Sequence, residues 1–399
     1  MAVDATASEA TSRKPRVVGV DITRGVALLG MMAVHSFDTF TGDGAPSPAT
    51  MIAAGRSAAT FVFVAGVSLA FVSGGRTVVQ GHQRTAAAAG IAVRGLFVGL
   101  LGLALAYLDS GVDIILAAYG LMFLLAIPLL ARSPRTLAGI TAGLIIVGPV
   151  LLVATAGSIN VTHGSADPSL GMLLTSPREL LALLLVTGGY PVVVYMAYLC
   201  AGIAVGRLDL TSRRVAGWLL GGGLTLAAAA QAGAWLLLYP LGGLDKLTAL
   251  DPGSAVTSRQ QLLWEPERLP SWWYLALPSP HANTPFDLAH TLGSAMAILG
   301  AALLLTRMQV LARALRPIAV LGGMTLTLYT GHLILLASGV LEDNALGLYL
   351  LMAGTALVFA MTWARHHEQG PLERLIAQIA SRTRRAVADR LTPMTTQNT

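Results

Sequence analysis

Ten apolar stretches of about 20 residues recur along this 399-residue chain, and they constrain the fold more than any other feature. As a helix, each is long enough to cross the ~30 Å hydrocarbon core of a bilayer. Only 12% of the residues are charged and the mean hydropathy is +0.68, as is typical of polytopic membrane proteins. The sequence therefore predicts an all-α polytopic membrane helix bundle of about ten transmembrane helices. We place the spans at 17–38, 50–73, 85–108, 111–131, 136–157, 182–205, 214–238, 286–306, 317–340 and 345–365.

The positive charges predict how this bundle is oriented. Of the 26 Lys and Arg residues, 19 lie at the chain ends and in the even-numbered gaps between spans, against 4 in the opposite loops. Because Lys and Arg concentrate in cytoplasmic loops, we expect both termini in the cytoplasm. The net charge of +6 is thereby explained by orientation rather than by binding to nucleic acid. Arg outnumbers Lys by 24 to 2, which we interpret as a GC-rich bacterial genome, and hence a bacterial plasma membrane.

Polar segments interrupt or flank the membrane domain. The region 366–392 spaces its apolar residues along one face and predicts an amphipathic helix on the inner membrane surface, beginning near Gly370–Glu373. Within the sixth span, Gly188–Pro191 could separate a re-entrant piece from a shorter span. The expected organisation is a disordered cytoplasmic tail (1–16), a membrane domain (17–365) with outer loops at 158–181 and 239–285, the interfacial helix (366–392) and a disordered tail (393–399).

Aromatic residues gather in the second outer loop, at Trp264, Trp272, Trp273 and Tyr274. Trp and Tyr favour the membrane interface, so an interfacial belt is the first interpretation. A surface on which sugars stack is the alternative.

The first span carries three ionisable residues, Asp21, Arg24 and His35, although hydrocarbon strongly disfavours such groups. On a helix, Arg24 and His35 lie roughly 16 Å apart along the axis. The predicted orientation puts Arg24 near the inner leaflet and His35 near the outer one. Taken alone, His35 could be an interfacial histidine, and Arg24 could simply pair with Asp21.

Other spans bring ionisable residues to similar depths. Asp287 and His290 begin the eighth span on the outer side and share one helix face. His332 lies in the outer half of the ninth span, Arg56 lies in the outer half of the second, and Arg94 lies near mid-depth. We therefore expect a polar site in the outer half, with Arg24 and Arg94 below it. The structural alternatives are a local Asp287–His290 pair and a His332 buried against another helix.

These residue types suit acid–base chemistry on an anionic substrate. A histidine can take a proton from a hydroxyl or amine, and an arginine can bind phosphates or a developing oxyanion. The sequence contains no Walker motif, dinucleotide fingerprint or His-Glu-x-x-His, and Cys200 is its single cysteine. Nucleotide hydrolysis, dinucleotide redox chemistry and a metal site are therefore not expected.

Several motifs resemble one known group. The Arg24-x10-His35 spacing resembles integral-membrane acyltransferases, and residues 20–27, VDITRGVA, look like the start of the heparan-α-glucosaminide N-acetyltransferase-like family and its bacterial relatives of unknown function. The resemblance extends from about residue 16 to 376. Its further pieces are GRLDL at 206–210, PHANTPFD at 280–287, MTLTLYTGH at 324–332 and GPLE at 370–373.

The resemblance implies transfer of an acyl group, acetyl in the simplest case, from cytoplasmic acyl-CoA to an acceptor beyond the membrane. It implies His35 as the base, and Arg24 as a residue that stabilises the site or contacts the donor. From depth we add His332, Asp287 and His290 to the catalytic set, and Arg94 and Arg56 to the donor-binding set. The loop 36–50 lacks the histidine that the lysosomal members place there, so a heparan-like acceptor is not expected.

The expected acceptor is an extracytoplasmic or lipid-linked glycan, membrane lipid is a necessary partner, and a homo-oligomer is compatible with the sequence. Two other classes of protein stay open. A proton-coupled membrane transporter would also use intramembrane His, Asp and Arg, and a non-catalytic partner of envelope machinery would need none of them.

Overall fold

The computed structural model describes residues 16–155, 167–250, 255–269 and 271–391. Within these residues the regular structure is helical, apart from one isolated β-bridge between Phe40 and Pro46. The helices are α1 (Val18–Ser36), α2 (Pro48–Ala53), α3 (Arg56–Val72), α4 (Gly81–Leu105), η1 (Ala106–Leu108), α5 (Leu116–Ala126), η2 (Ile127–Ala131), α6 (Pro134–Thr155), α7 (Leu170–Thr175), α8 (Pro177–Ala182), η3 (Leu183–Thr187), α9 (Val192–Gly206), α10 (Arg213–Leu238), α11 (Gly243–Thr248), α12 (Ala255–Trp264), η4 (Trp272–Ala276), α13 (Pro285–Leu305), α14 (Gln309–Ala314), α15 (Arg316–Gly322), α16 (Thr325–Ala337), α17 (Ala345–Trp363) and α18 (Pro371–Leu391).

The predicted spans all coincide with apolar helices, but not all are continuous crossings. In the described part of the chain, seven helices are long and apolar enough to cross a membrane, and the number rises to nine if each of two bent helix pairs is one span. The fourth predicted span, 111–131, is a shorter helix at Leu116–Ala131. The all-α membrane fold is therefore confirmed, while the count of ten crossings stays a prediction.

Both bends occur at glycine-containing breaks. Pro177–Thr187 and Val192–Gly206 meet at 59°, with the break at Gly188–Pro191 where the sequence allowed one. The second bend was not predicted, because 317–340 was expected as one span. Arg316–Gly322 and Thr325–Ala337 instead meet at 83°. A Cβ on Gly322 would lie 1.7 Å from the carbonyl oxygen of Asp21, so the break presses against the backbone of α1.

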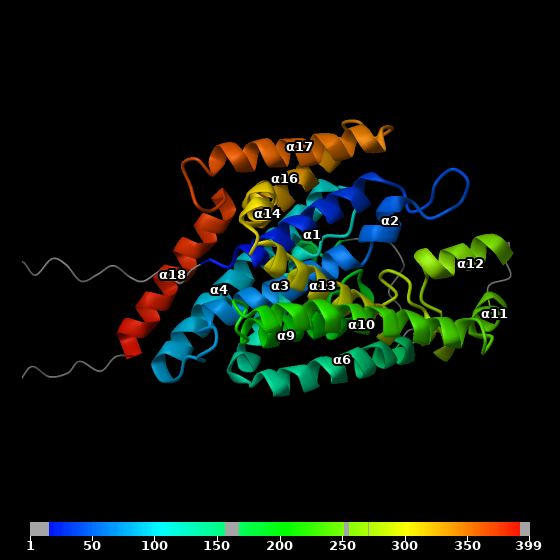
Figure 1. Cartoon of the computed structure of the whole chain (residues 1–399), viewed down its shortest axis with the longest axis horizontal. Helices are drawn as coiled ribbons and strands as arrows, with labels where there is room; N and C mark the ends of the chain where they lie inside the picture. Colours follow the sequence, from blue (N-terminus) through cyan, green and yellow to red (C-terminus); the bar gives the residue numbers. More distant parts are fainter. Residues whose placement is uncertain (1–15, 156–166, 251–254, 270, 392–399) are drawn as a thin grey trace, which may run out of the picture.

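The long helices run alongside one another (Figure 1). The core lies around α3 and α9, both of which are buried along nearly their whole length. The helix α17 covers one side of the bundle, and α6 and α10 cover the other. The helices α11 and α12 lie at one end, opposite α18. Arg16 reaches the carbonyl oxygen of Glu368 (3.5 Å), so the first and last described segments meet at the α18 end.

Small residues bring α10 and α13 into close contact. A Cβ on Gly223 would lie 2.5 Å from the carbonyl oxygen of Gly293, and a Cβ on Gly293 would lie 2.6 Å from that of Gly223. Close backbone approach of this kind is a main source of helix association in lipid. It fixes α13, and with it the loop that precedes α13.

Arg207 ties three helix ends together. Its guanidinium donates to the carbonyl oxygen of Ala70, in the last turn of α3, and to those of Ser73 and Gly75, just after that helix. It also donates to the carbonyl oxygen of Leu130 in η2. Arg207 is also the residue that follows α9. The last carbonyls of a helix lack partners within it and attract cations, so one buried arginine stabilises the C-termini of all three helices.

The helix α18 begins at Pro371, as predicted, but its acid serves another helix. The Glu373 carboxylate accepts from the backbone N–H groups of Leu326 (2.6 Å) and Thr327 (3.1 Å), and from the Thr327 hydroxyl (2.6 Å). These amides belong to the first turn of α16, where an acceptor is normally supplied locally. Glu373 therefore couples α18 to the bent segment that carries His332. The helix also packs along α4 and buries Ile376 and Ala380.

We expect Glu373→Ala to lower the free energy of unfolding by about 1–3 kcal/mol, since it leaves two amides in the first turn of α16 without their acceptor. Thermal unfolding of detergent-purified protein measures this. Asp389→Ala is the control, because Asp389 is an exposed acid on the same helix. Equal stability of the two variants would contradict the proposed coupling.

Candidate active site

Two histidines from distant parts of the chain meet at the C-terminal end of α1. His35 lies in the last turn of α1, His332 lies on α16, and His35 Nδ1 is 3.1 Å from His332 Nε2. Their rings stack with centroids 5.3 Å apart and planes 18° apart. The sequence predicted that these residues share a depth, and the structure brings them into direct contact.

The histidine pair has an accessible and a buried member. His332 is 2% exposed, and its Nδ1 has no partner among the described residues, whereas His35 is half-buried. One nitrogen of the contacting pair must donate and the other accept. When His35 Nδ1 is the donor, His35 Nε2 keeps its lone pair and can accept a proton. Tyr329 packs edge-on against His332, with centroids 4.9 Å apart, and is buried as expected for a packing residue.

A third histidine, His281, joins this region, and sequence reasoning did not select it. It is exposed, lies 3.4 Å from the Tyr195 hydroxyl through Nδ1, contacts the ring of Tyr190 edge-on, and is within electrostatic reach of His35. His281 precedes α13 in a loop where both it (φ 60°) and Asn283 (φ 56°) adopt the left-handed conformation. Non-glycine residues rarely do so, and such strained residues cluster at functional sites.

Asp287 holds this loop. Its Oδ2 accepts from the Asn283 N–H (3.0 Å), its own N–H donates to the Thr284 hydroxyl (3.1 Å), and the Asn283 amide donates to the His281 carbonyl (2.9 Å). The signal was present in the sequence as Thr284-Pro285-Phe286-Asp287, which has the spacing of a capping box. The buried Asp287 is thus turned toward the His281 loop, and it makes no ion pair with His290 among the described contacts.

His290 pairs with Arg56 instead. Arg56 Nε is 3.1 Å from His290 Nε2, and Arg56 Nη1 donates to the carbonyl oxygen of Met51 (2.9 Å). His290 Nδ1 also lies 3.3 Å from the carbonyl oxygen of Ala227 on α10. Arg56 therefore lies at the start of α3, against α13. Along α3 it lies twelve residues, or roughly 18 Å, from Ser68, which Arg24 contacts.

The opposite end of α1 carries a cluster of arginines. Arg24 donates to Asp21 (2.8 Å) and to the Ser68 hydroxyl, and the same Asp21 carboxylate binds Arg16 (2.5 Å). The local Arg24–Asp21 pair, which the sequence analysis kept as an alternative to a functional Arg24, is present. Arg94 lies within electrostatic reach of Arg24, and its side chain makes no hydrogen bond or ion pair in the described part of the chain. The cluster formed by Arg16, Arg24 and Arg94 is paired directly with the Asp21 carboxylate, and Glu373 lies within electrostatic reach of Arg24. Three arginines against two carboxylates leave an excess of positive charge.

Buried polar atoms lie between the two ends. The Tyr119 hydroxyl and the Thr60 hydroxyl are buried and have no partner among the described residues. Tyr119 packs against Phe61 and is within electrostatic reach of both Arg24 and Tyr329. Unpaired polar groups are costly in an apolar interior, and each needs an explanation. Here they mark a polar strip from the arginine cluster toward the histidine pair.

Metal-ligating residues do not gather in this site. Among the described residues, no group of three or more His, Cys, Asp or Glu side chains is arranged to hold a metal ion.

The fold and the site define a polytopic membrane protein in which a histidine pair and an arginine cluster occupy the two ends of one helix. Residues 16–239, more than half of the chain, match the family model described as heparan-alpha-glucosaminide N-acetyltransferase, catalytic. The chain belongs to this family, which indicates a membrane acetyltransferase-type function. The match includes α1 through α10 and hence Arg24 and His35. A search of curated proteins finds no match.

Proposed function

We propose that the protein transfers an acyl group, acetyl in the simplest case, from cytoplasmic acyl-CoA to a hydroxyl or amine of an extracytoplasmic or lipid-linked glycan. The observation that carries this proposal is the His35–His332 contact at one end of α1, with the arginine cluster at the other. A base and an anion-binding group on opposite sides suit a reaction whose two substrates approach from opposite faces. Family membership supports the reaction class.

The arginine cluster is the proposed donor-binding region. Coenzyme A carries several phosphate charges, and Arg24 and Arg94 supply positive charge that Asp21 only partly compensates. Arg56, predicted as a third donor-binding residue, lies with His290 at the outer end and is better placed to bind the acceptor or to orient His290. The polar strip at Tyr119 gives the amide and thioester groups of the donor hydrogen-bonding partners on the way to His35.

The proposed chemistry is direct transfer. His35 Nε2 takes the proton of the acceptor hydroxyl or amine as its oxygen or nitrogen attacks the thioester carbonyl. The carbon–sulfur bond then breaks, and the coenzyme A thiolate recovers the proton from His35. His332 acts by holding His35 in the tautomer that leaves Nε2 free. Asp287 acts by holding the His281 loop, from which His281 can bind the acceptor.

Arg94→Gln tests the donor region, because Arg94 has no structural partner whose loss would disturb the fold. Acyl-CoA should raise the melting temperature of wild-type protein in detergent as its concentration increases. We expect Arg94→Gln to raise the dissociation constant about tenfold, which corresponds to about 1.4 kcal/mol. Arg313→Gln, at an exposed arginine in a predicted inner loop, should bind as wild type does. If no acyl-CoA stabilises folded wild-type protein, the proposed donor is wrong.

The two bent helix pairs favour a proton-coupled transporter as the second candidate, since broken helices line the substrate sites of many transporters. The measurement that separates the candidates uses proteoliposomes. Movement of an unmodified substrate driven by a proton gradient would support transport, whereas an acylated acceptor formed from acyl-CoA supports transfer.

A further inference from the structure

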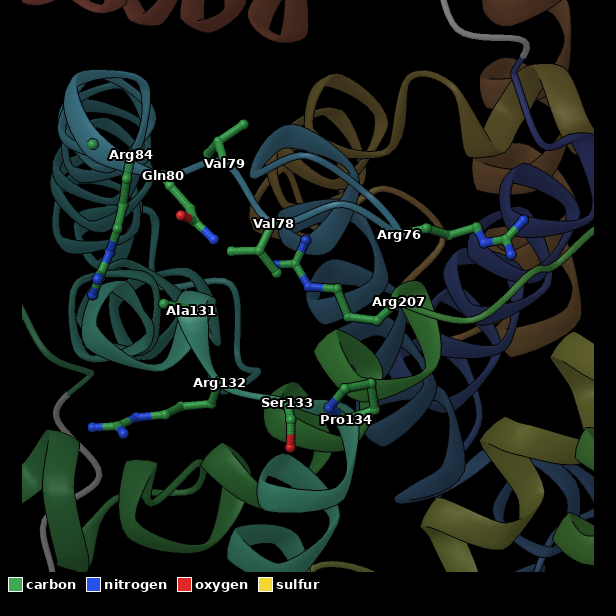
Figure 2. Close-up of a pocket in the computed structure, with 11 residues that line it drawn as sticks. Arg76, Val78, Val79, Gln80, Arg84, Ala131, Arg132, Ser133, Pro134 and Arg207 are labelled. Atoms are coloured by element: carbon green, nitrogen blue, oxygen red, sulfur yellow. The ribbon is translucent and has the colours of Figure 1, made fainter.

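A cavity of about 660 Å³ lies away from the histidine pair, where the starts of α4 and α6 meet the ends of η2 and α9. It is formed by the 76–81 loop, the first turn of α4, the 131–134 turn and the side chain of Arg207 (Figure 2). The predicted orientation places this end of the bundle at the cytoplasmic face. The cavity therefore opens toward the side from which soluble anions and inner-leaflet headgroups approach.

Four arginines line the cavity, and no acidic residue is among its lining residues. Two of them are already engaged, because Arg207 binds backbone carbonyls and Arg76 pairs with Asp209 (3.4 Å). Arg84 and Arg132 are exposed, and their side chains make no hydrogen bond or ion pair within the described residues. In Figure 2 their side chains extend to the same side, whereas Arg76 extends away from them.

The backbone adds to this positive field. The helices α4 and α6 both begin at the cavity, and they are 25 and 22 residues long. The first turn of each helix is the positive end of its dipole, and such turns are common binding positions for phosphate. At α6, Pro134 has no N–H and the Thr136 N–H donates to the Ser133 hydroxyl (3.1 Å), so α6 contributes its dipole rather than free amides. At α4, the preceding Gln80 makes no side-chain cap, so the amides of that first turn are not satisfied by it.

A buried hydrogen-bond donor without a partner, the Nε of Arg207, is evidence that the cavity binds a ligand. Arg207 is 6% exposed, it lines the cavity, and its Nε has no partner among the described residues although both of its terminal nitrogens do. A buried donor that the protein leaves unsatisfied carries a desolvation cost of about 1–3 kcal/mol. An anion in the cavity would offset it.

We propose that this cavity binds a phosphate or diphosphate group, held by Arg84, Arg132 and the first turn of α4, with the dipole of α6 adding to the positive field. Two kinds of molecule present that group at the inner face, a soluble nucleotide-type ligand and an anionic lipid headgroup. The site stands on its own geometry and does not require the proposed acyl transfer. The positive-inside distribution accounts for arginines in inner loops, but it does not account for four of them around one cavity. Arg213 and Arg313 also lie in predicted inner loops, and they line no part of this cavity.

The test compares two double variants with equal charge change. Binding of inorganic pyrophosphate to full-length protein in detergent is followed by thermal shift for wild type, for Arg84→Gln with Arg132→Gln, and for Arg213→Gln with Arg313→Gln. We expect the cavity variant to bind at least tenfold more weakly and the control variant to match wild type. Equal weakening of pyrophosphate binding in both variants would show that net charge alone causes the effect, and would overturn the proposal. Absence of pyrophosphate binding to folded wild-type protein would overturn it as well.

The source of the phosphate is then identified by competition. Displacement of pyrophosphate by adenosine 3′,5′-bisphosphate indicates a soluble ligand, and displacement by short-chain phosphatidylglycerol indicates a lipid. Failure of this site is distinguishable from failure of the proposed function, because acyl-CoA stabilisation that depends on Arg94 is measured separately. Loss of pyrophosphate binding in the cavity variant alone would support the site whichever competitor is effective.

Discussion

His35→Ala is expected to reduce acyl transfer by about 10²–10⁴-fold, the range that a positioned general base contributes. The proton acceptor in the proposed reaction is His35 Nε2, and removing the ring leaves no base at that position. His332 cannot replace it, because His332 is 2% exposed and its near nitrogen faces His35. The measurement is single-turnover formation of acylated acceptor from labelled acyl-CoA.

Binding of the donor should survive this substitution. Arg24 and His35 are eleven positions apart on α1, roughly 16 Å along the axis, so the arginine cluster is untouched. The expected pattern is a low transfer rate with an unchanged dissociation constant for acyl-CoA. His82→Ala is the matched control, since His82 is an exposed histidine on α4. Transfer at the wild-type rate by His35→Ala would exclude His35 as the base.

Intact mass after incubation with donor alone distinguishes direct transfer from a covalent route. Direct transfer leaves the protein mass unchanged, because no bond forms between His35 and the acyl group. An added acyl mass that disappears in His35→Ala would show instead that His35 carries the acyl group.

The helices were predictable because their signals are local. Apolar runs placed α1, α10 and α17 to within two residues, and Pro371 gave the start of α18. The fourth span failed in length for a non-local reason. The Ile114 N–H donates to Asp167 (3.1 Å), so the residue is held by a distant side chain rather than by a continuation of the helix. The 83° bend depends on contact between Gly322 and α1, which no local pattern encodes.

The sequence indicated the depth of the candidate site residues along their helices, but not which neighbouring helix each side chain faces. Position along a span gave the common depth of His35 and His332, and it correctly separated them from Arg24. Helices that are apolar all round carry no periodicity to show which face meets a neighbour. Asp287 and His290 therefore looked like a pair at i and i+3, whereas the first holds the His281 loop and the second binds Arg56. His281 lies outside every predicted span and was passed over for that reason.

Arg207→Met is expected to cause the largest loss of stability of any substitution discussed. The methionine keeps much of the apolar stem but removes all five hydrogen bonds that the guanidinium donates, four of them to backbone carbonyls. A buried carbonyl without a donor costs about 1–3 kcal/mol, and three helix C-termini lose their cation at once. Allowing for water at this end of the bundle, we expect a loss of about 3–5 kcal/mol in the free energy of unfolding.

Thermal unfolding in detergent and the yield of monodisperse protein measure this effect. Arg207→Lys keeps the charge but lacks the planar fork that reaches α3 and η2 together, so its stability should fall between wild type and Arg207→Met. It also keeps the prediction testable if the methionine variant does not fold. Arg213→Gln, six positions further along at the start of α10, removes an exposed charge and should unfold as wild type does. A methionine variant as stable as Arg213→Gln would show that Arg207 does not hold these helix ends together.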